Sequence, residues 1–562
     1  MFRFPPAAGA PAPRRRASRL VTVAAALTAA SVILVGCSAQ SSSTEETAST
    51  TPDSLVIATP TSPTHFFYDA GNNVYPATEI EMQINSTLLV NPYAQSDQDE
   101  NALRQDVYEF EGGLAESYEV SEDGLVYTFH LRQGVVSQSG NPFTADDVVW
   151  SFTEKFGNPT AVFQAISKPA ITDPATQIVK VDDSTVTMTI TDAGYGQTLL
   201  SLISNVTAQI FDSTVLQENA TPEDPFGVAW AKANPLIGVG YGAYMIDSFT
   251  PDADTTIVAN PDYWGDTPAI ETVIYKVVGD SATRAQSLRN GDVDIAENLA
   301  PQEQSDAQAA GGVNVFSLDT NIYSFMVPVA NKAPFDNTLV RQAMAYAIPY
   351  DQILDNVYLG RATQPTGYLD ATAPGYTDAG LPEYSYDPEK SKELLADAGF
   401  PDGVSFSLTV NADTPDLVAA AVQMQAEAAD AGFTIEINQQ PSAAFSAGRT
   451  AGDYQAMLLR DYAITLTPPY EMNLFTTKGS PLNYPKWEDD TFYGLMATAQ
   501  SLGDPLTDEA GAAYNKAEAY MLDEAAMIFY AQVQPSYAVS DAVTGWAWRS
   551  DNWLDVSQLS FK

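Results

Sequence analysis

The sequence predicts a mixed α/β protein that folds in water and has more than one hydrophobic core. Without its first 36 residues the chain still has 526, which is ample for two or three domains. Segments with strand and helix patterns are interspersed along the chain, as in mixed α/β proteins. Beyond residue 36 no apolar run is long enough to cross a membrane.

The first 36 residues have the pattern of an export signal. Residues 1–19 contain five arginines and no acid, and residues 20–36 contain no charged residue. Leu34-Val35-Gly36-Cys37 fits the lipobox of bacterial lipoproteins, in which the chain is cut before a lipidated cysteine. A plain membrane anchor is the alternative, since the apolar stretch almost spans a bilayer. Cys37 is the only cysteine and ends the apolar run, which favours lipidation.

The exported chain would be strongly acidic. Removing the five arginines of the signal leaves 21 basic residues against 71 acidic ones, a formal net charge of −50. This excess argues against nucleic acid and anionic lipid as partners. The acids are dispersed, which favours a solubilising surface over a calcium site or a cationic ligand. Residues 37–54, rich in Ser and Thr, predict a flexible tether about 20–25 Å across.

The folded chain is expected to begin with a buried strand and a helix. Leu55-Val56-Ile57-Ala58 is a short apolar run that ends before Pro60, which predicts a buried strand. Residues 77–90 have helical spacing of their large apolar side chains, at Ile80, Ile84, Leu88 and Leu89.

A hairpin and a capped helix follow. Residues 118–131 alternate apolar and polar side chains on either side of Asp123-Gly124, a pair that favours a tight turn with positive φ. Thr144 is a natural N-cap, and the acids after it suit the first turn of a helix.

The later elements mix both types. Residues 181–190 and 272–278 predict strands, and residues 282–289, 338–348, 388–398 and 416–431 predict helices. Asp387-Pro388-Glu389 is a strong helix start, and Gly399 and Gly432 are placed to end helices.

The common catalytic and metal-binding motifs are missing from the sequence. It has no G-x-S-x-G, Walker, H-E-x-x-H or C-x-x-C motif. With two histidines, His65 and His130, and a single cysteine, a zinc or nickel site is not expected, nor is any cofactor. His130 fits a strand surface, whereas His65 lies in a loop beside aromatic residues. Aromatic side chains in non-periodic segments suit a cleft around a partly apolar ligand, among them Phe66, Tyr68 and Tyr462.

Several segments, in order, resemble the oligopeptide/dipeptide/nickel class of ABC-transporter substrate-binding proteins, solute-binding protein family 5. The resemblance covers roughly residues 55–562 and rests on the shared order of these motifs: Leu114-Ala115-Glu116-Ser117-Tyr118 through Tyr127-Thr128-Phe129-His130-Leu131-Arg132, Pro142-Phe143-Thr144-Ala145-Asp146-Asp147-Val148, Asn260-Pro261-Asp262-Tyr263-Trp264-Gly265, Gly291-Asp292-Val293-Asp294-Ile295, Pro334-Phe335-Asp336 with Val340-Arg341-Gln342-Ala343, and Tyr386-Asp387-Pro388-Glu389-Lys390.

This resemblance implies a two-lobed periplasmic-binding-protein-like fold of the class II type, closing on a ligand like a hinged trap. Lobe I would combine residues 55–90, 169–318 and 529–562, with a small domain inserted at 91–168. Lobe II would span 319–528, with Tyr323 near its start as a candidate ligand contact.

The informative departure from the family lies in the expected second lobe. Peptide-binding members often carry an Asp within a stretch like Trp-x-Ala-Asp-Tyr-x-x-Pro, which pairs with the α-ammonium of the peptide. Aligned without gaps, Ile464 takes that position here, whereas a local shift would let Asp461 supply the carboxylate. Without such a pocket, Arg460 would face an acidic or hydroxylated ligand.

The resemblance therefore predicts a non-enzymatic, extracytoplasmic receptor, lipid-anchored at the outer face of the cytoplasmic membrane. It would be a monomer that delivers a small solute, first of all short peptides, to an ABC permease. The alternative cargoes are an oligosaccharide, an opine-like compound or a chelated metal, and the distant alternative is a surface-anchored hydrolase.

Overall fold

A computed structural model describes residues 54–71, 75–168 and 170–562. The signal sequence, Cys37 and all but the last residue of the predicted tether lie outside the described residues. Within the described part of the chain, no helix is long and apolar enough to cross a membrane.

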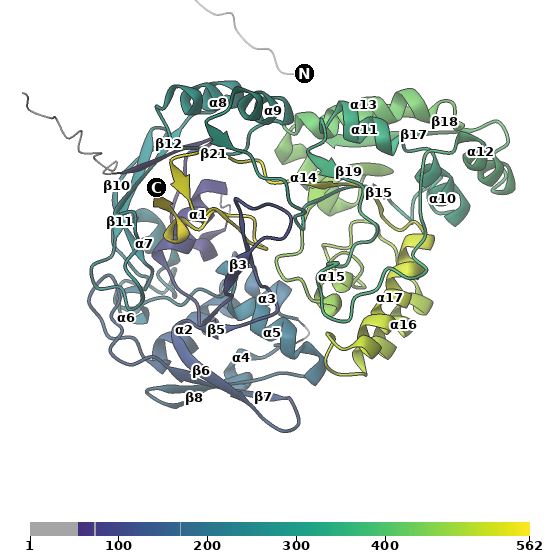
Figure 1. Cartoon of the computed structure of the whole chain (residues 1–562). Helices are drawn as coiled ribbons and strands as arrows, with labels where there is room; N and C mark the ends of the chain where they lie inside the picture. Colours follow the sequence, from purple (N-terminus) through teal and green to yellow (C-terminus); the bar gives the residue numbers. More distant parts are fainter. Residues whose placement is uncertain (1–53, 72–74, 169) are drawn as a thin grey trace, which may run out of the picture. The chain divides into compact units, whose positions relative to one another are not determined.

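The first large sheet contains both early and late segments of the chain (Figure 1). Its strands, in spatial order, are β10 (Tyr244–Thr250), β11 (Asp254–Ala259), β12 (Thr272–Val277), β1 (Leu55–Thr59), β13 (Ile295–Ala296), β21 (Ala538–Ser540) and β14 (Val313–Asn314). Strand β1 pairs in parallel with β12 and β13. Leu55 and Ile57 pack into one core while Ala58 packs into another, so β1 is buried on both faces, as its apolar run predicted.

The second large sheet is built mostly from residues 323–533. Its order is β16 (Ala362–Thr363), β20 (Ile528–Val533), β15 (Tyr323–Pro328), β19 (Ala456–Asp461), β17 (Val404–Asn411) and β18 (Phe433–Gln440). Strand β15 is antiparallel to both β19 and β20, whereas β17 is parallel to β18 and β19.

Smaller sheets complete the strand pairing. An antiparallel sheet has the order β6 (Ala115–Val120), β7 (Val126–Leu131), β9 (Thr185–Thr189) and β8 (Ile178–Asp182). Short pairings join β2 (Leu89–Val90) to β5 (Glu111–Gly112), β22 (Val543–Thr544) to β24 (Ser560–Phe561), and β23 (Ala547–Trp548) to β4 (Leu103–Gln105) and β3 (Tyr93–Gln95).

Helices lie on both sides of the large sheets. In the part of the chain before β15 they are α1 (Tyr75–Ile84), α2 (Ala145–Gly157), α3 (Phe163–Ile166), α4 (Pro174–Gln177), α5 (Gly196–Ile203), α6 (Ser213–Glu218), α7 (Val228–Ala233), α8 (Ser281–Asn290) and α9 (Pro301–Ala310). After β15 they are α10 (Thr338–Tyr346), α11 (Tyr350–Asn356), α12 (Pro388–Asp397), α13 (Pro415–Ala428), α14 (Ser442–Ala451), α15 (Pro468–Leu474), α16 (Asp490–Gln500) and α17 (Asp508–Asp523). Single 3₁₀ turns occur at Tyr68–Ala70, Ala193–Tyr195, Val206–Ala208 and Val556–Gln558.

Most locally encoded elements are confirmed. The hairpin β6–β7 turns at Gly124 with φ of +72°. Thr144 caps α2 in a capping box with Asp147: the side chain of each residue accepts a hydrogen bond from the backbone N–H of the other. Asp387 caps α12 through the Lys390 N–H, and the four predicted later helices are present with small shifts at their ends.

Two predicted elements were wrong in extent. The helix predicted for residues 77–90 ends at Ile84, because the Ile84 carbonyl accepts from the Gly242 N–H and the chain then turns into β2. Leu88 and Leu89 are nevertheless wholly buried. The strand predicted for residues 181–190 is a hairpin, β8–β9, because the Asp182 carboxylate accepts from the Ser184 N–H and turns the chain there.

The predicted domain boundaries remain predictions, but strand pairing bears on them. Strand β20 stays in the second sheet up to Val533, and the chain rejoins the first sheet at Ala538, somewhat later than the expected boundary at 528/529. The sheet β6–β7–β9–β8 runs past residue 168, so the expected inserted domain at 91–168 supplies only two of its strands.

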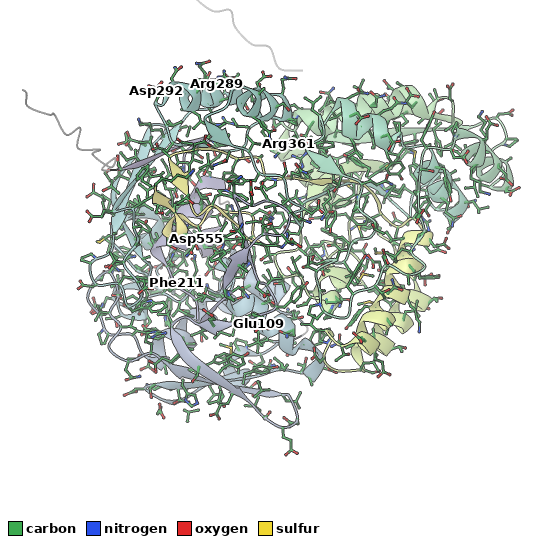
Figure 2. All side chains as sticks on the ribbon, in the orientation of Figure 1. Glu109, Phe211, Arg289, Asp292, Arg361 and Asp555 are labelled. Carbon is green, nitrogen blue, oxygen red and sulfur yellow. The ribbon has the colours of Figure 1, made fainter. Side chains whose placement is uncertain are left out.

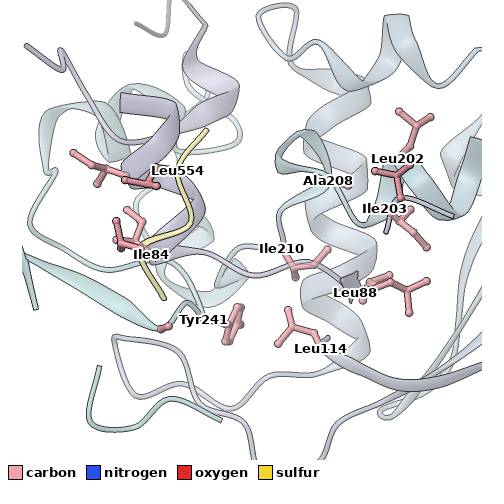
Figure 3. Packing of buried hydrophobic residues seen from close by; sticks show 14 of the residues in the cluster. Ile84, Leu88, Leu114, Leu202, Ile203, Ala208, Ile210, Tyr241 and Leu554 are labelled. Carbon is pink, nitrogen blue, oxygen red and sulfur yellow. The ribbon is translucent and has the colours of Figure 1, made fainter. Parts of the chain in front are cut away.

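Separate hydrophobic cores lie against the two large sheets. The largest joins α1 and the first sheet to the small antiparallel sheet and α5, and Figure 3 shows part of it around Ile84, Leu88, Ile210 and Tyr241. One face of the second sheet packs on α10, α11 and α13, and the other on α16 and α17. The sequence expectation of more than one core is therefore confirmed.

Hydrogen bonds join the segments that cross between the two sheets. Arg361, labelled in Figure 2, donates to Gln304 of α9, to the Phe316 carbonyl and to Ser317. The Asn321 side chain donates to the carbonyls of Ala463 and Ser550, at 2.6 and 2.7 Å. The ends of β19 and of β15 are thus tied to the C-terminal segment, which positions the site described next.

Candidate ligand-binding site

Strand β19 directs Asp461 and Arg460 to opposite faces of the second sheet. Side chains alternate along a strand, and Met457 and Leu459 belong to the core that contains Tyr323 and Phe325. Asp461 is in register with Tyr323 of β15 and shares that face. Arg460 instead forms an ion pair with Asp416 of α13 on the other face. The structure therefore does not bring the two predicted residues together, and Arg460 is already paired.

Asp461 lies deep in the protein without an ion-pair partner in the described part of the chain. Its Oδ1 accepts from the Tyr462 N–H at 2.9 Å, and no other donor among the described residues reaches the carboxylate. Burial raises the pKa of Asp461 to about 6, although the Tyr462 N–H and the charge of Arg449 lower it. Asp461 nevertheless keeps some accessible surface.

Tyrosine side chains lie near this carboxylate. The pKa of Tyr470 is raised by burial and by the charge of Asp461. Burial also raises the pKa of Tyr462, with further effects of Asp551, Tyr68 and Asp461. Tyr462 therefore lies near both Asp461 and Tyr68, although Tyr68 is almost 400 positions earlier. We call Asp461, Tyr462, Tyr68, Tyr470 and Tyr323 the Asp461 site.

A second group of acids lies close by but is largely neutralised. Glu471 is almost wholly buried, and neither of its carboxylate oxygens accepts a hydrogen bond of normal geometry from the described residues. Its pKa is raised well above normal by burial, with further contributions from Asp370 and Glu518. Glu518 accepts from the backbone N–H groups of Tyr368 and Leu369, and its pKa is raised to about 7, mainly by burial. Burial therefore disfavours the charged form of both glutamates.

Hydrogen bonds join the part of the chain before β15 to the part after it, near the Asp461 site. Tyr108 donates to Asp370 at 2.7 Å. The Thr198 and Thr467 hydroxyls are hydrogen-bonded at 2.9 Å, and Asn205 donates to the Ile464 carbonyl at 3.2 Å. Ile464 itself packs against the large core. Ile464 thus has an apolar environment. The Asp461 carboxylate, in contrast, is available to bind a cationic group.

Two of the predicted ligand contacts lie inside the protein instead. His65 is wholly buried; its Nε2 donates to the Gly71 carbonyl and its Nδ1 accepts from the Phe67 N–H. Burial lowers the His65 pKa, so the ring is neutral. Phe66 is in the core, edge-on to Phe249 at 5.1 Å. Both side chains are therefore part of the protein interior in this conformation.

A small aromatic cavity adjoins the Asp461 site through Tyr462. We call it the tryptophan pocket; it has a volume of about 120 Å³ and is lined mainly by the C-terminal segment, including Trp546, Trp548, Asp551, Trp553, Tyr537, Ser536 and Ile322. Sequence reasoning missed these residues. The run Trp546-Ala547-Trp548-Arg549-Ser550-Asp551-Asn552-Trp553, which holds three of the seven tryptophans, was an available signal.

A larger cavity lies elsewhere. Its volume is about 520 Å³, and its wall is mostly amide and hydroxyl side chains from α1, the segment after it and the C-terminal end, with Tyr93 and Trp264. None of the seven predicted ligand contacts lines it. Its wall also contains the charged side chains of Glu111, Arg549 and Asp555.

Comparison with known proteins places the chain in a family. The model of bacterial extracellular solute-binding proteins, family 5, matches residues 109–483. The dipeptide-binding protein of Escherichia coli K12 is 26% identical over 459 residues, which cover 77% of this chain and 83% of that protein. Heme-binding protein A of Haemophilus influenzae is 34% identical over 333 residues, covering 54% of this chain and 58% of that protein.

Solved structures share the fold across almost the whole chain. The periplasmic binding protein DppA from Helicobacter pylori, in complex with the peptide STSA, aligns with a TM-score of 0.75 at 22% identity, covering 90% of this chain and 98% of that one. MoaA in complex with mannopinic acid, from A. tumefaciens R10, has a TM-score of 0.73 at 22% identity, covering 91% and 99%. The predicted two-lobed periplasmic-binding-protein-like fold is confirmed, and the chain belongs to family 5 of the bacterial extracellular solute-binding proteins.

Proposed function

We propose that this receptor captures short peptides by their α-ammonium group at Asp461 and delivers them to an ABC permease. The observation that carries the proposal is the state of Asp461, a buried carboxylate that has no ion-pair partner among the described residues. We further propose that the protein is a monomeric, non-enzymatic receptor, lipid-anchored through Cys37 on the outer face of the cytoplasmic membrane.

The physics of the site favours a cationic group on the ligand. Burial makes the charged form of Asp461 unfavourable and raises its pKa to about 6. A nearby ammonium group would stabilise this charged form. Charge-assisted hydrogen bonds between such groups are about twice as strong as neutral ones. The surrounding tyrosines would enclose the adjoining backbone of the peptide and exclude water.

The relatives support a peptide and also supply the alternative. The relative from E. coli is named for dipeptides, and the H. pylori structure holds a tetrapeptide. Other relatives are named for heme or were solved with mannopinic acid. Asp461 supports the peptide, because a short peptide carries a free α-ammonium with which a carboxylate can pair.

The direct test is to purify residues 38–562 without denaturation and identify the ligand that accompanies them by native mass spectrometry. Calorimetric titration of ligand-freed protein with dipeptides and tripeptides should then show one site per chain. The peptides should be recovered unchanged, because a receptor does not turn over its ligand. Co-purification of a heme or an opine, with no peptide binding, would refute the peptide assignment while retaining the receptor.

Peptide affinity should depend on pH with a maximum between about 6 and 8. Below the Asp461 pKa of about 6, protonation removes the charge that attracts the ligand, so Kd should rise roughly tenfold per pH unit. Above about 8 the peptide amine, with an ordinary pKa of about 7.7–8.0, loses its own charge. Titrations from pH 4.5 to 9 check this, and a profile that is flat below pH 6 would exclude Asp461 as the partner.

A further inference from the structure

The cavity of about 520 Å³ lies apart from the Asp461 site. Its wall comes only from residues 82–264 and 549–558, and we call it the amide cavity after its many amide side chains, among them Gln83, Gln105 and Gln209. No residue of the Asp461 site lines it, and neither does any residue of the second large sheet. Small-molecule sites usually enclose about 300–1,000 Å³, so the amide cavity is large enough for a compact ligand.

Two buried amides in this wall have unused hydrogen-bonding groups. Gln83 and Gln105 are each 4% exposed. The Gln105 Oε1 accepts from the Ser550 N–H at 3.1 Å, but its NH₂ group donates to no other described residue. The Gln83 NH₂ group donates to the carbonyls of Glu79 and Leu554, but its Oε1 accepts from no described donor. Because buried polar groups almost always have partners, the wall favours an occupant that both donates and accepts hydrogen bonds.

The charged side chains at the C-terminal end of the wall bind one another. Arg549 donates two parallel hydrogen bonds to Asp551, at 3.0 and 2.9 Å, and its Nη1 lies 3.6 Å from the Asp555 carboxylate. Tyr93 donates to Asp555 at 2.8 Å and accepts from Arg549 at 2.9 Å. The remaining charged residue, Glu111, is exposed, where salt and water screen it. With no unpaired cation among its described side chains, the wall disfavours an anion and fits an uncharged ligand.

Two adjacent aromatic rings form a firm part of the same wall. The ring centres of Tyr263 and Trp264 are 5.0 Å apart. The Trp264 indole N–H donates to the Tyr241 carbonyl at 3.1 Å, and the Arg132 guanidinium lies 4.6 Å from the centre of the Trp264 ring. A sugar ring suits such a wall, because its C–H groups pack against aromatic rings and each of its hydroxyls both donates and accepts hydrogen bonds.

We propose that the amide cavity is a second binding site, for a neutral mono- or disaccharide, and that it works independently of the Asp461 site. Sugar hydroxyls would accept from the Gln105 NH₂ group and donate to the Gln83 Oε1, and a C–H face would pack on Tyr263 or Trp264. Since the two sites share no residue, a saccharide would bind whether or not a peptide occupies the Asp461 site.

Val90 offers a matched pair of variants at the opening of the cavity. Val90 and Glu111 are paired across β2 and β5, and both line the cavity and are exposed. Because Val90 is 38% exposed, a larger side chain has room there. Val90→Trp would obstruct the opening, whereas Val90→Ala leaves it open. Gln105→Glu tests the amide itself, because it keeps an oxygen for the Ser550 N–H and removes both amide donors.

The test applies saturation-transfer NMR and calorimetry to residues 38–562 with five neutral sugars: glucose, galactose, N-acetylglucosamine, maltose and cellobiose. Gluconate is the anionic comparison. We expect at least one neutral sugar to bind at one site per chain and gluconate not to bind. Val90→Trp and Gln105→Glu should each weaken that sugar at least tenfold, whereas Val90→Ala and Asp461→Asn should bind it like the parent protein.

Failure of all five sugars to bind the parent protein would overturn the proposal. Binding of gluconate as tight as that of the sugar, or unchanged sugar affinity in Val90→Trp, would overturn it too. Loss of the sugar in Asp461→Asn would place it at the Asp461 site and refute a second site. Melting temperatures check that the variants fold, and if Gln105→Glu does not, the two Val90 variants decide. None of these outcomes depends on dipeptide binding, so the proposed function can fail separately.

Discussion

Replacing Asp461 with alanine is expected to raise the Kd for dipeptides at least about 30-fold. Losing one partner of a buried, hydrogen-bonded charge pair costs about 2–5 kcal/mol of binding free energy, which corresponds to about 30- to 5,000-fold in Kd. An effect of this size is expected because, among the described residues, no cationic side chain is within ion-pair distance of Asp461. The ligand's ammonium would therefore be its only ion-pair partner there. Calorimetric titration at pH 7.5 with a dipeptide that binds the parent protein measures the loss.

Asp461→Asn separates lost binding from lost folding. Asparagine keeps the shape and the hydrogen bond from the Tyr462 N–H but not the charge. Since burial makes the charged form of Asp461 unfavourable, the Asn variant should melt at the same temperature as the ligand-free parent or higher. Asp453→Ala, a change at an exposed acid eight positions earlier, is the control and should bind normally. Normal dipeptide affinity in Asp461→Asn would rule out this carboxylate as the ammonium partner.

Among the variants proposed here, Lys155→Met is expected to lower the free energy of unfolding the most, by about 3–5 kcal/mol. Lys155 of α2 and Asp69 are both wholly buried, with Nζ 2.5 Å from Oδ2, and Nζ also lies 4.5 Å from the centre of the Phe211 ring. The neighbouring Glu154 has a pKa raised well above normal, mainly by burial, so it adds little negative charge. Without the lysine, Asp69 would remain as an unpaired buried carboxylate. Urea unfolding of residues 38–562 measures the difference.

The same substitution at an exposed lysine provides the comparison. Lys180 bridges Asp146 and Asp183 on the surface, where water and salt screen the charges. Lys180→Met should therefore leave the urea midpoint almost unchanged. The double variant Asp69→Asn with Lys155→Met should recover much of the lost stability, because it leaves no unpaired charge. If Lys155→Met and Lys180→Met have equal midpoints, the buried pair contributes nothing measurable.

Locally encoded features could be predicted because their determinants are close together in the chain. Thr144 and Asp147 are three residues apart and form the capping box of α2 by themselves. Gly124 supplies the positive φ at the β6–β7 turn. The apolar run from Leu55 to Ala58 already indicated burial on both faces. Where a prediction failed, a distant segment intervened, as when the Gly242 N–H took the carbonyl of Ile84 and ended α1.

The order of the family motifs was enough to predict the two-lobed fold and the class of receptor, since scaffold turns and caps are local signals. The sequence also identified Asp461, Tyr462 and Tyr68 as candidates, but it offered Arg460 and His65 on the same grounds. Only tertiary structure distinguishes their surroundings: β19 alternation turns Arg460 toward Asp416, and His65 is wholly buried. The tryptophan pocket likewise depends on the C-terminal segment meeting Tyr462. The direction in which a side chain points and the degree to which it is buried depend on contacts between segments hundreds of residues apart. No local sequence pattern encodes these contacts.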